Sequence, residues 1–265
     1  MKNKLLTVVA IIIAIVMVLS VFAACSKQDN ANTGTSKLKT IKPGVLTVGS
    51  DTTWPPMEYV EGDKIVGFDV DLTQAIADKI GLKLDYQSAA WDGLFPALTS
   101  HKYDMAISSI TITNERKKEM DFSNPYFKTD QSATTKEDAG IDAVEKMDGK
   151  TAGVQIGTTG ELASKDIKGC TTKTYDDILM AFEDLKAGRI DAVICDSYVG
   201  YSYSMKNKGF KVGFVMTTDE KLGIAFAKDT PELLAAVNGA LKTLIGDGTY
   251  DSIYEKWFGT KPPKL

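Results

Sequence analysis

One arginine and a run of hydroxyl side chains follow a short apolar segment before the middle of the chain. Residues 108–116 (SSITITNER) come directly after the apolar residues 105–107. A guanidinium binds a carboxylate through two parallel hydrogen bonds, and nearby hydroxyl and backbone N–H groups add further donors. This segment therefore predicts a site for a carboxylate. The residues expected in it are Ser108, Ser109, Thr111 and Arg116.

Two further segments complete a site for a molecule with two opposite charges. Residues 157–160 (GTTG) lie between a predicted strand and a predicted helix, where the backbone N–H groups of Thr158 and Thr159 can bind an anion. Asp196 follows the apolar residues 192–194 and offers a carboxylate. A guanidinium and a carboxylate in one site would bind the two charged groups of a free α-amino acid, whose side chain needs a pocket of its own.

The chain shows little that could catalyse a reaction. His101 is the only histidine and lies in a polar turn, which argues against Ser-His-Asp triads and against zinc sites with several His or Cys ligands. Gly149-Lys150-Thr151 resembles the end of a phosphate-binding loop, but Val144 occupies the position of the required glycine. We expect no metal, no cofactor and no enzymatic activity, but a binding cleft.

Alternating strands and helices must position these residues. Apolar runs at 45–48, 105–107 and 192–194 are typical of buried parallel strands, and residues 83–87 alternate like a strand. Asp69 is expected to cap a helix that carries Leu72, Ile76 and Ile80 and ends at Gly81. Thr230 and Pro231 are expected to open another helix, followed by a last helix that contains Trp257. These elements predict an α/β protein.

An internal repeat predicts two lobes of similar construction. Residues 95–109 match residues 182–196 without a gap, and each copy reads as a helix, a tight turn and a buried strand. In open α/β sheets, ligands bind beyond the carboxyl ends of the strands. These ends carry Ser108 and Ser109 in one copy and Cys195 and Asp196 in the other. Facing lobes would bring hydroxyl groups to a carboxylate, unless the match arises from strand patterns that are common to many proteins.

Residues 1–24 are expected to be an export signal. Lys2 and Lys4 precede a long apolar run that ends at small residues, although a retained transmembrane anchor remains an alternative. The sequence before Cys25 resembles a lipoprotein cleavage box, which predicts a lipid on Cys25. Residues 25–40 are rich in small and polar residues and are expected to be a flexible tether. Both alternatives place the remaining chain outside the cytoplasmic membrane.

Charge and cysteine content narrow the possible partners. The formal net charge of −4 gives no reason to expect nucleic acid, which favours a basic surface. Beyond Cys25 only Cys170 and Cys195 remain, in no C-x-x-C motif. A single bridge between these two is one possibility, and two small buried side chains is the other.

Six motifs follow one another along the chain, at residues 67–71 (GFDVD), 110–116 (ITITNER), 121–123 (DFS), 157–159 (GTT), 188–192 (GRIDA) and the closing segment 248–259. Together they resemble the polar amino acid-binding proteins of ABC importers, which include glutamine-, histidine- and lysine/arginine/ornithine-binding proteins. The resemblance runs from about residue 46 to 261. It implies a two-lobe periplasmic-binding-protein fold of type II with a two-strand hinge.

The resemblance also implies a role for each site residue. Arg116 would bind the ligand carboxylate together with Thr111 and the N–H of Thr159, and Asp196 would bind the ammonium beside Ser109. The distal part of the site would be formed by Asp51, Trp54, Trp91, Gln155 and Cys195. Plainer alternatives exist: Arg116 could pair with Asp121 on the surface, Asp196 could cap the following helix, and the tryptophans could belong to the core.

The family fold implies a domain layout and a mechanism. Lobe 1 would comprise residues 41–127 and 223–265, and lobe 2 residues 128–222, with hinge crossings near 128–129 and 221–222. Closure about the hinge would bring Arg116 and Asp196 onto one ligand, and the ligand would stabilise the closed form. The partners would be a free polar amino acid and the cognate ABC permease, and we expect a monomer tethered to the membrane.

Two tryptophans around the ligand side chain, with Asp51 at its end, favour arginine or lysine through cation–π attraction. Glutamine and histidine come next. One rival function is a dehydratase of prephenate-like or arogenate-like acids on the same fold, which would need Glu58 or Asp51 as its acid. The other rival is a receptor ectodomain, which requires a further membrane segment after the fold, whereas the sequence given ends at Leu265.

Overall fold

The computed structural model describes residues 38–263. The predictions for the export signal, for a lipid on Cys25 and for the tether up to residue 37 lie outside the described residues. Within this described range, no helix is both long and apolar enough to cross a membrane.

The first sheet has five strands in the order β5-β1-β6-β13-β7. β1 pairs in parallel with β5 and β6, whereas β13 runs antiparallel to both β6 and β7. Only β13 follows residue 222, so the chain leaves this sheet after β7 and returns to it near its end. The strands are β1 (Val45–Ser50), β5 (Lys83–Ser88), β6 (Met105–Ala106), β7 (Asp121–Phe122) and β13 (Ala225–Phe226).

The second sheet repeats this order as β10-β9-β11-β8-β12. β9 is parallel to β10 and β11, and β8 is antiparallel to β11 and β12. Three parallel strands followed by two antiparallel steps therefore occur in both sheets, and the predicted two-lobe α/β fold is confirmed. The strands are β8 (Phe127–Lys136), β9 (Thr151–Gln155), β10 (Thr171–Tyr175), β11 (Ala192–Asp196) and β12 (Phe210–Leu222).

The repeated segments of the sequence occupy equivalent places in the two sheets. Helix α3 (Trp91–Thr99) leads into β6, and helix α6 (Ile178–Lys186) leads into β11. The turns between them place His101 (φ 59°) and Gly188 (φ 73°), which correspond in the repeat, in the left-handed region. The His101 side chain is 48% exposed and lies 3.3 Å from Asp229, as expected for a polar turn.

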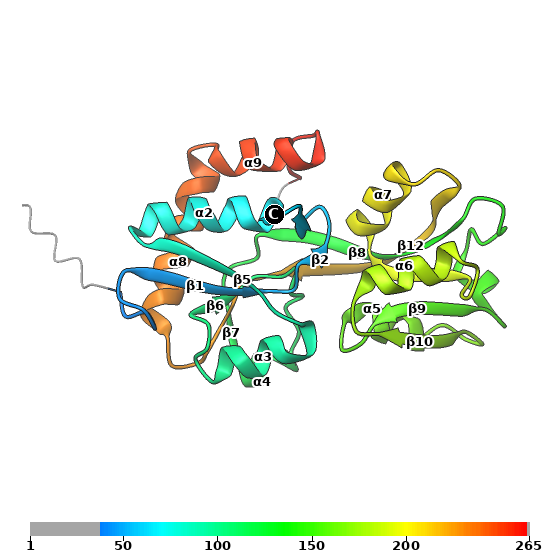
Figure 1. The fold of residues 1–265 in the computed structure, drawn as a ribbon, viewed down its shortest axis with the longest axis horizontal. Coiled ribbons are helices and arrows are strands. Elements are labelled where there is room, and N and C mark those ends of the chain that lie inside the picture. The colour runs from blue at the N-terminus through cyan, green and yellow to red at the C-terminus, as the bar shows by residue number, and fades with distance from the viewer. Residues whose placement is uncertain (1–37, 264–265) are drawn as a thin grey trace, which may run out of the picture. The chain divides into compact units, whose positions relative to one another are not determined.

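Helix α2 (Phe68–Ile80) packs against α8 (Pro231–Gly246) and α9 (Thr249–Phe258), and Figure 1 shows α2 and α9 on one side of the first sheet with α3 on the other. α2 ends at Gly81 in the left-handed conformation, and Pro231 occupies the first turn of α8, both as predicted. Leu72 and Ile76 of α2 are fully buried. The apolar stripe predicted for this helix therefore faces the core.

The prediction that Asp69 caps α2 is wrong. Gly67 is the N-cap residue, and no side chain caps the helix. The backbone of Gly67 has φ 144°, and a Cβ there would lie 1.9 Å from the carbonyl oxygen of Met57. This close approach requires glycine. Asp69 is instead fully buried and accepts hydrogen bonds from Tyr126 and from the backbone of Ser109.

Strands β8 and β12 link the first sheet to the second, and Figure 1 shows them side by side across this region. Their pairing matches Phe127 with Leu222 and Thr129 with Glu220. The register shifts between Met216 and Glu220, and Asp219 within the shift has φ 48°. Such an irregularity bends a strand and redirects a side chain, here that of Glu220.

Shorter elements complete the described fold. The three-stranded sheet β2-β3-β4 lies between β1 and α2 in sequence. The remaining elements are β2 (Thr53–Trp54), β3 (Glu58–Glu61), β4 (Lys64–Val66), α4 (Arg116–Glu119), α5 (Thr159–Lys165), α7 (Ser197–Lys206) and the 3₁₀ turn η1 (Val144–Met147).

Candidate functional site

Nine of the twelve residues predicted to bind the ligand line one small cavity. Its volume is about 10 Å³, which is room for about one water molecule. Residues that follow β6 meet Asp196 at the end of β11, so equivalent strands of the two sheets supply opposite walls. A larger molecule can enter only if these walls move apart. The lining residues are Trp54, Trp91, Ser108, Ser109, Thr111, Arg116, Thr158, Thr159 and Asp196.

Arg116 begins the short helix α4 and points its guanidinium into this cavity. Nη1 donates to the carbonyl of Thr111 (2.8 Å) and Nη2 to the carbonyl of Gly157 (3.2 Å). The guanidinium carbon also lies 5.3 Å from the ring centre of Trp91 and 5.2 Å from that of Phe95. Burial lowers the pKa of Arg116 to about 10, although the negative charges of Glu220 and Asp196 oppose this shift.

Arg116 therefore has no direct carboxylate partner among the described residues. The alternative of a surface pair with Asp121 does not hold, because the ion-pair partner of Asp121 is Lys228 (3.6 Å). The guanidinium of Arg116 is partly withdrawn from water and no anion of the described residues pairs with it directly, so it is well placed to bind one.

Asp196 contributes a buried carboxylate on the opposite wall. It accepts hydrogen bonds from Gln131 Nε2 (2.5 Å) and from the Tyr198 hydroxyl (2.8 Å), and it does not cap α7 through its side chain. Burial raises the pKa of Asp196 to about 7, and the charge of Glu220 adds to this effect. Hydrogen bonds from Tyr198 and Gln131 and the charge of Arg116 act in the opposite direction.

The start of α5 lies close to β11 because of a glycine. A Cβ on Gly160 would lie 2.9 Å from the carbonyl oxygen of Ile194, so a larger residue would push the helix away. Thr158 caps α5 by accepting from the N–H of Glu161 (3.2 Å), as expected for a hydroxyl residue at this position. The Thr159 hydroxyl lies 3.4 Å from that of Thr111, so the start of α5 meets the segment that follows β6.

Asp51 and Gln155 lie beyond the cavity lining and form a buried hydrogen-bond chain with Trp54. Gln155 Nε2 donates to Asp51 (2.7 Å), and Trp54 Nε1 donates to Gln155 Oε1 (2.6 Å). Burial raises the pKa of Asp51, the charge of Asp177 raises it further, and the hydrogen bonds from Gln155 and Thr53 lower it. Two carboxyl groups, those of Asp51 and Asp177, therefore lie near each other beyond the cavity.

Comparison with known proteins identifies the family of this chain. The profile of the bacterial extracellular solute-binding proteins, family 3, matches residues 46–260. The chain belongs to this family. The L-cystine-binding protein TcyJ of Escherichia coli (strain K12) is 33% identical over 255 residues, which cover 94% of this chain and 95% of that protein.

Solved structures give a similar result for this solute-binding protein. An ancestral arginine-binding protein bound to arginine is 43% identical, with a TM-score of 0.78, and the match covers 82% of this chain and 99% of that one. The ancestral amino acid-binding protein AncCDT-1, a precursor of cyclohexadienyl dehydratase, is 38% identical, with a TM-score of 0.76. That match covers 81% of this chain and 96% of that one.

Both cysteines within residues 38–263 of the solute-binding protein, Cys170 and Cys195, are free thiols. Cys195 is buried in the hydrophobic core and is not among the residues that line the cavity, whereas Cys170 is half-buried. Burial raises the pKa of the Cys195 thiol. The possibility of a bridge between these two residues is therefore excluded, and only Cys195 fits the alternative of a fully buried side chain.

Two buried carboxyl groups that the sequence did not predict as a pair lie beside Ser108 and Ser109. Glu58 and Asp69 are both fully buried. Ser108 and Ser109 donate to the two oxygens of Glu58 (3.2 and 3.4 Å), and the backbone N–H of Ser109 donates to Asp69 (3.2 Å). Burial raises the pKa of Glu58 well above its usual range and that of Asp69 to about 7. The pair fixes Ser109, whose φ is 51°.

The Glu58→Gln variant is expected to weaken the pH dependence of stability. A carboxyl group whose pKa is raised by folding stabilises the protein at low pH, and this contribution is lost as pH rises through the folded pKa. In Glu58→Gln, an amide that does not titrate replaces one carboxyl of the pair. Between pH 5 and 8 the free energy of unfolding should therefore fall by a few kcal/mol more in the wild type than in this variant. Urea unfolding at pH 5, 6, 7 and 8 measures this difference.

The exposed Glu61 on the same strand provides the control, because Glu61→Gln should keep the wild-type slope. Equal slopes for Glu58→Gln and the wild type would show that Glu58 carries no part of the pH dependence.

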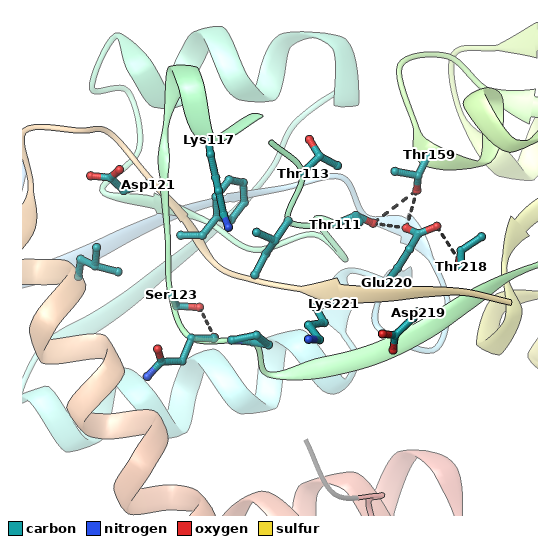
Figure 2. A pocket seen from close by; sticks show the side chains of 15 residues that line it. Thr111, Thr113, Lys117, Asp121, Ser123, Thr159, Thr218, Asp219, Glu220 and Lys221 are labelled. Atoms are coloured by element: carbon teal, nitrogen blue, oxygen red, sulfur yellow. Dashed lines mark hydrogen bonds between the residues drawn. The ribbon is translucent and has the colours of Figure 1, made fainter. Parts of the chain in front are cut away.

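Glu220 and Gln131 were also missed, although both are buried beside the site. Gln131 Nε2 lies between two carboxylates, at 2.5 Å from Asp196 and 3.0 Å from Glu220. An open groove of about 860 Å³, whose lining side chains are shown in Figure 2, is lined by Glu220 and shares Thr111 and Thr159 with the small cavity. Glu220 therefore stands where the two spaces meet.

Proposed function

We propose that this solute-binding protein captures a polar L-amino acid between its lobes and delivers it to an ABC importer. The observation that supports this most directly is that Arg116, at the start of α4, and Asp196, at the end of β11, line the same cavity. The guanidinium would bind the ligand carboxylate, helped by Thr111, Thr158 and Thr159, and the carboxylate would bind the ammonium. Lobes of residues 41–127 with 223–265 and of residues 128–222 would close about the paired strands β8 and β12.

The ligand that we favour is arginine or lysine, ahead of glutamine and histidine. Trp54 and Trp91 line the cavity, and aromatic rings attract a cation. Asp51, with the charge of Asp177 nearby, makes the distal end acidic. A basic side chain would compete with the amide of Gln155 for Asp51. The similar proteins whose names specify L-cystine and arginine make both compounds necessary in any test.

Thermal unfolding of residues 26–265 with each of the twenty amino acids, ornithine and cystine tests this proposal. A ligand present at 100 times its Kd stabilises the folded state by about 2.7 kcal/mol, which raises the Tm of a protein of this size by about 5–10 °C. We expect such a rise for arginine or lysine. No rise with any of these compounds would contradict amino acid binding.

A dehydratase is the weaker alternative. The similarity to AncCDT-1 is to an amino acid-binding precursor. The two candidate acids, Glu58 and Asp51, are absent from the cavity lining and are hydrogen-bonded to Ser108 and Gln155, respectively. An assay for product release from prephenate and arogenate distinguishes the two functions, and we expect no turnover.

We further propose that the protein acts at the outer face of the cell membrane as a monomer anchored by a lipid on Cys25. The family description as extracellular supports an extracytoplasmic location. Labelling with radioactive palmitate should mark the wild type and not Cys25→Ser.

A further inference from the structure

Glu220 accepts hydrogen bonds from four residues, three of which are distant from it in the sequence. Its Oε2 accepts from the hydroxyls of Thr111 (2.6 Å) and Thr159 (2.8 Å). Its Oε1 accepts from Gln131 Nε2 (3.0 Å) and from the Thr218 hydroxyl (3.1 Å). Figure 2 shows the hydroxyls of Thr111, Thr159 and Thr218 converging on this carboxylate. A carboxylate with four donors is firmly placed.

Two of these donors are also part of the proposed amino acid site. Thr111 and Thr159 line the small cavity together with Arg116 and Asp196. A hydroxyl group has one proton to donate, and both of these protons are directed to Glu220. A ligand carboxylate bound by Arg116 would need the same protons.

The charge of Glu220 acts on the same groups that the ligand would contact. It favours the charged form of the Arg116 guanidinium and disfavours the ionised form of Asp196. A ligand carboxylate would do the first of these as well. A second carboxylate near Thr111 and Thr159 would be repelled by the first, because the surroundings are buried and screening by water is weak.

We propose that Glu220 competes with the ligand carboxylate for the hydroxyl donors of Thr111 and Thr159. This inference rests on the proposed function, because it concerns the carboxylate end of that site. Each binding event must redirect the two hydroxyl protons from Glu220 to the ligand. Glu220 thereby weakens binding of the amino acid and speeds its release, which suits a protein that must deliver its ligand to an importer.

The test compares binding of L-arginine to the wild type, Glu220→Gln and Asp219→Asn by isothermal titration calorimetry at pH 8. Glutamine at position 220 removes the charge and keeps the size of the side chain. Asp219 is exposed and precedes Glu220, so Asp219→Asn removes the same charge outside the hydrogen-bond cluster. At pH 8, above the pKa of about 7 for Asp196, this carboxyl is mostly ionised, so its titration contributes little.

We expect Glu220→Gln to bind arginine about tenfold more tightly than the wild type, through loss of like-charge repulsion. The dissociation rate measured by stopped flow should fall as well, and Asp219→Asn should stay within about twofold of the wild type. If Glu220→Gln fails to fold, Glu220→Ala provides the test, because it removes the charge and, unlike glutamine, leaves no acceptor for the two hydroxyls.

The possible failures are distinguishable. Unchanged or weaker binding by the folded Glu220 variants, with normal binding by the wild type, overturns the competitor role alone, and weaker binding would assign Glu220 to the ligand ammonium. Absence of wild-type binding to arginine, lysine, glutamine, histidine and cystine contradicts the proposed function itself, and the inference with it.

Discussion

The Arg116→Ala variant is expected to lose at least about 100-fold in affinity for the amino acid, or about 3 kcal/mol of binding free energy. The guanidinium lies on the cavity, is fixed by two carbonyl oxygens and two aromatic rings, and has no carboxylate partner among residues 38–263. A ligand carboxylate would therefore lose its only direct cationic partner in the cavity lining. Calorimetric titration with the amino acid identified in the thermal screen measures the loss.

The fold should tolerate this substitution. Burial disfavours the charge of Arg116, so its removal relieves a cost while sacrificing two hydrogen bonds and the contacts with Trp91 and Phe95. We expect the Tm of the ligand-free protein to change by only a few degrees. Arg116→Lys should also bind poorly, because an ammonium cannot form the paired hydrogen bonds of a guanidinium.

Lys117 provides a matched control for Arg116. It is the next residue, has the same charge, is exposed and lines the open groove that also contains Glu220. Lys117→Ala should bind with an affinity close to that of the wild type, since exposed charges are screened by water and salt. Full affinity in Arg116→Ala would mean that the guanidinium does not contact the ligand.

The sequence was informative where a local pattern determines the position of a side chain. Ser109 and Asp196 end the two copies of a repeat, Arg116 follows the first copy, and parallel strands place their carboxyl ends at one edge of each sheet. The family resemblance then assigned residues such as Trp54 and Thr159, which lie on the same cavity. Their roles in binding remain predictions.

The residues that were missed depend on contacts that no local pattern reveals. Glu220 lies in the charged run 219–221, which is typical of an exposed strand. Only the register shift before it and the long-range contacts with Thr111 and Thr159 bury its side chain. Asp69 was assigned as a helix cap because caps and buried acceptors use the same residue types.

Cys195 is a predicted site residue that does not line the cavity. It precedes Asp196 on β11, but successive side chains of a strand point to opposite faces, and that of Cys195 packs into the core. The assignment of Cys195 to the distal pocket came from the resemblance and remains a prediction, without support from the lining of the cavity.

The affinity of the wild type for its amino acid is expected to fall as pH is lowered below about 7. The carboxyl of Asp196 has a pKa of about 7 without ligand, and only its ionised form attracts an ammonium. The Kd should therefore rise about tenfold for each pH unit below 7 and level off above it. Binding at pH 7 should release about half a proton, which appears in calorimetry as a dependence of the enthalpy on the buffer.

Asp196→Asn should bind at least about 100-fold more weakly at pH 8 and should release no proton at this site, because an amide neither titrates nor carries charge. Asp219→Asn, which removes an exposed carboxylate, should keep both the affinity and the proton release. A wild-type Kd that stays constant from pH 5 to 8 would rule out Asp196 as the group that binds the ammonium.

Ionisation of Asp196 has opposite effects on the stability of the ligand-free fold and on the affinity for the ligand. Without ligand, the raised pKa values of Asp196, Asp69 and Glu58 stabilise the fold at low pH, and this contribution is lost as pH rises through them. With ligand, ionisation of Asp196 strengthens binding over the same range. The Tm difference between the bound and free protein should therefore widen from pH 5 to pH 8 in the wild type, and in Asp196→Asn it should stay small and nearly constant.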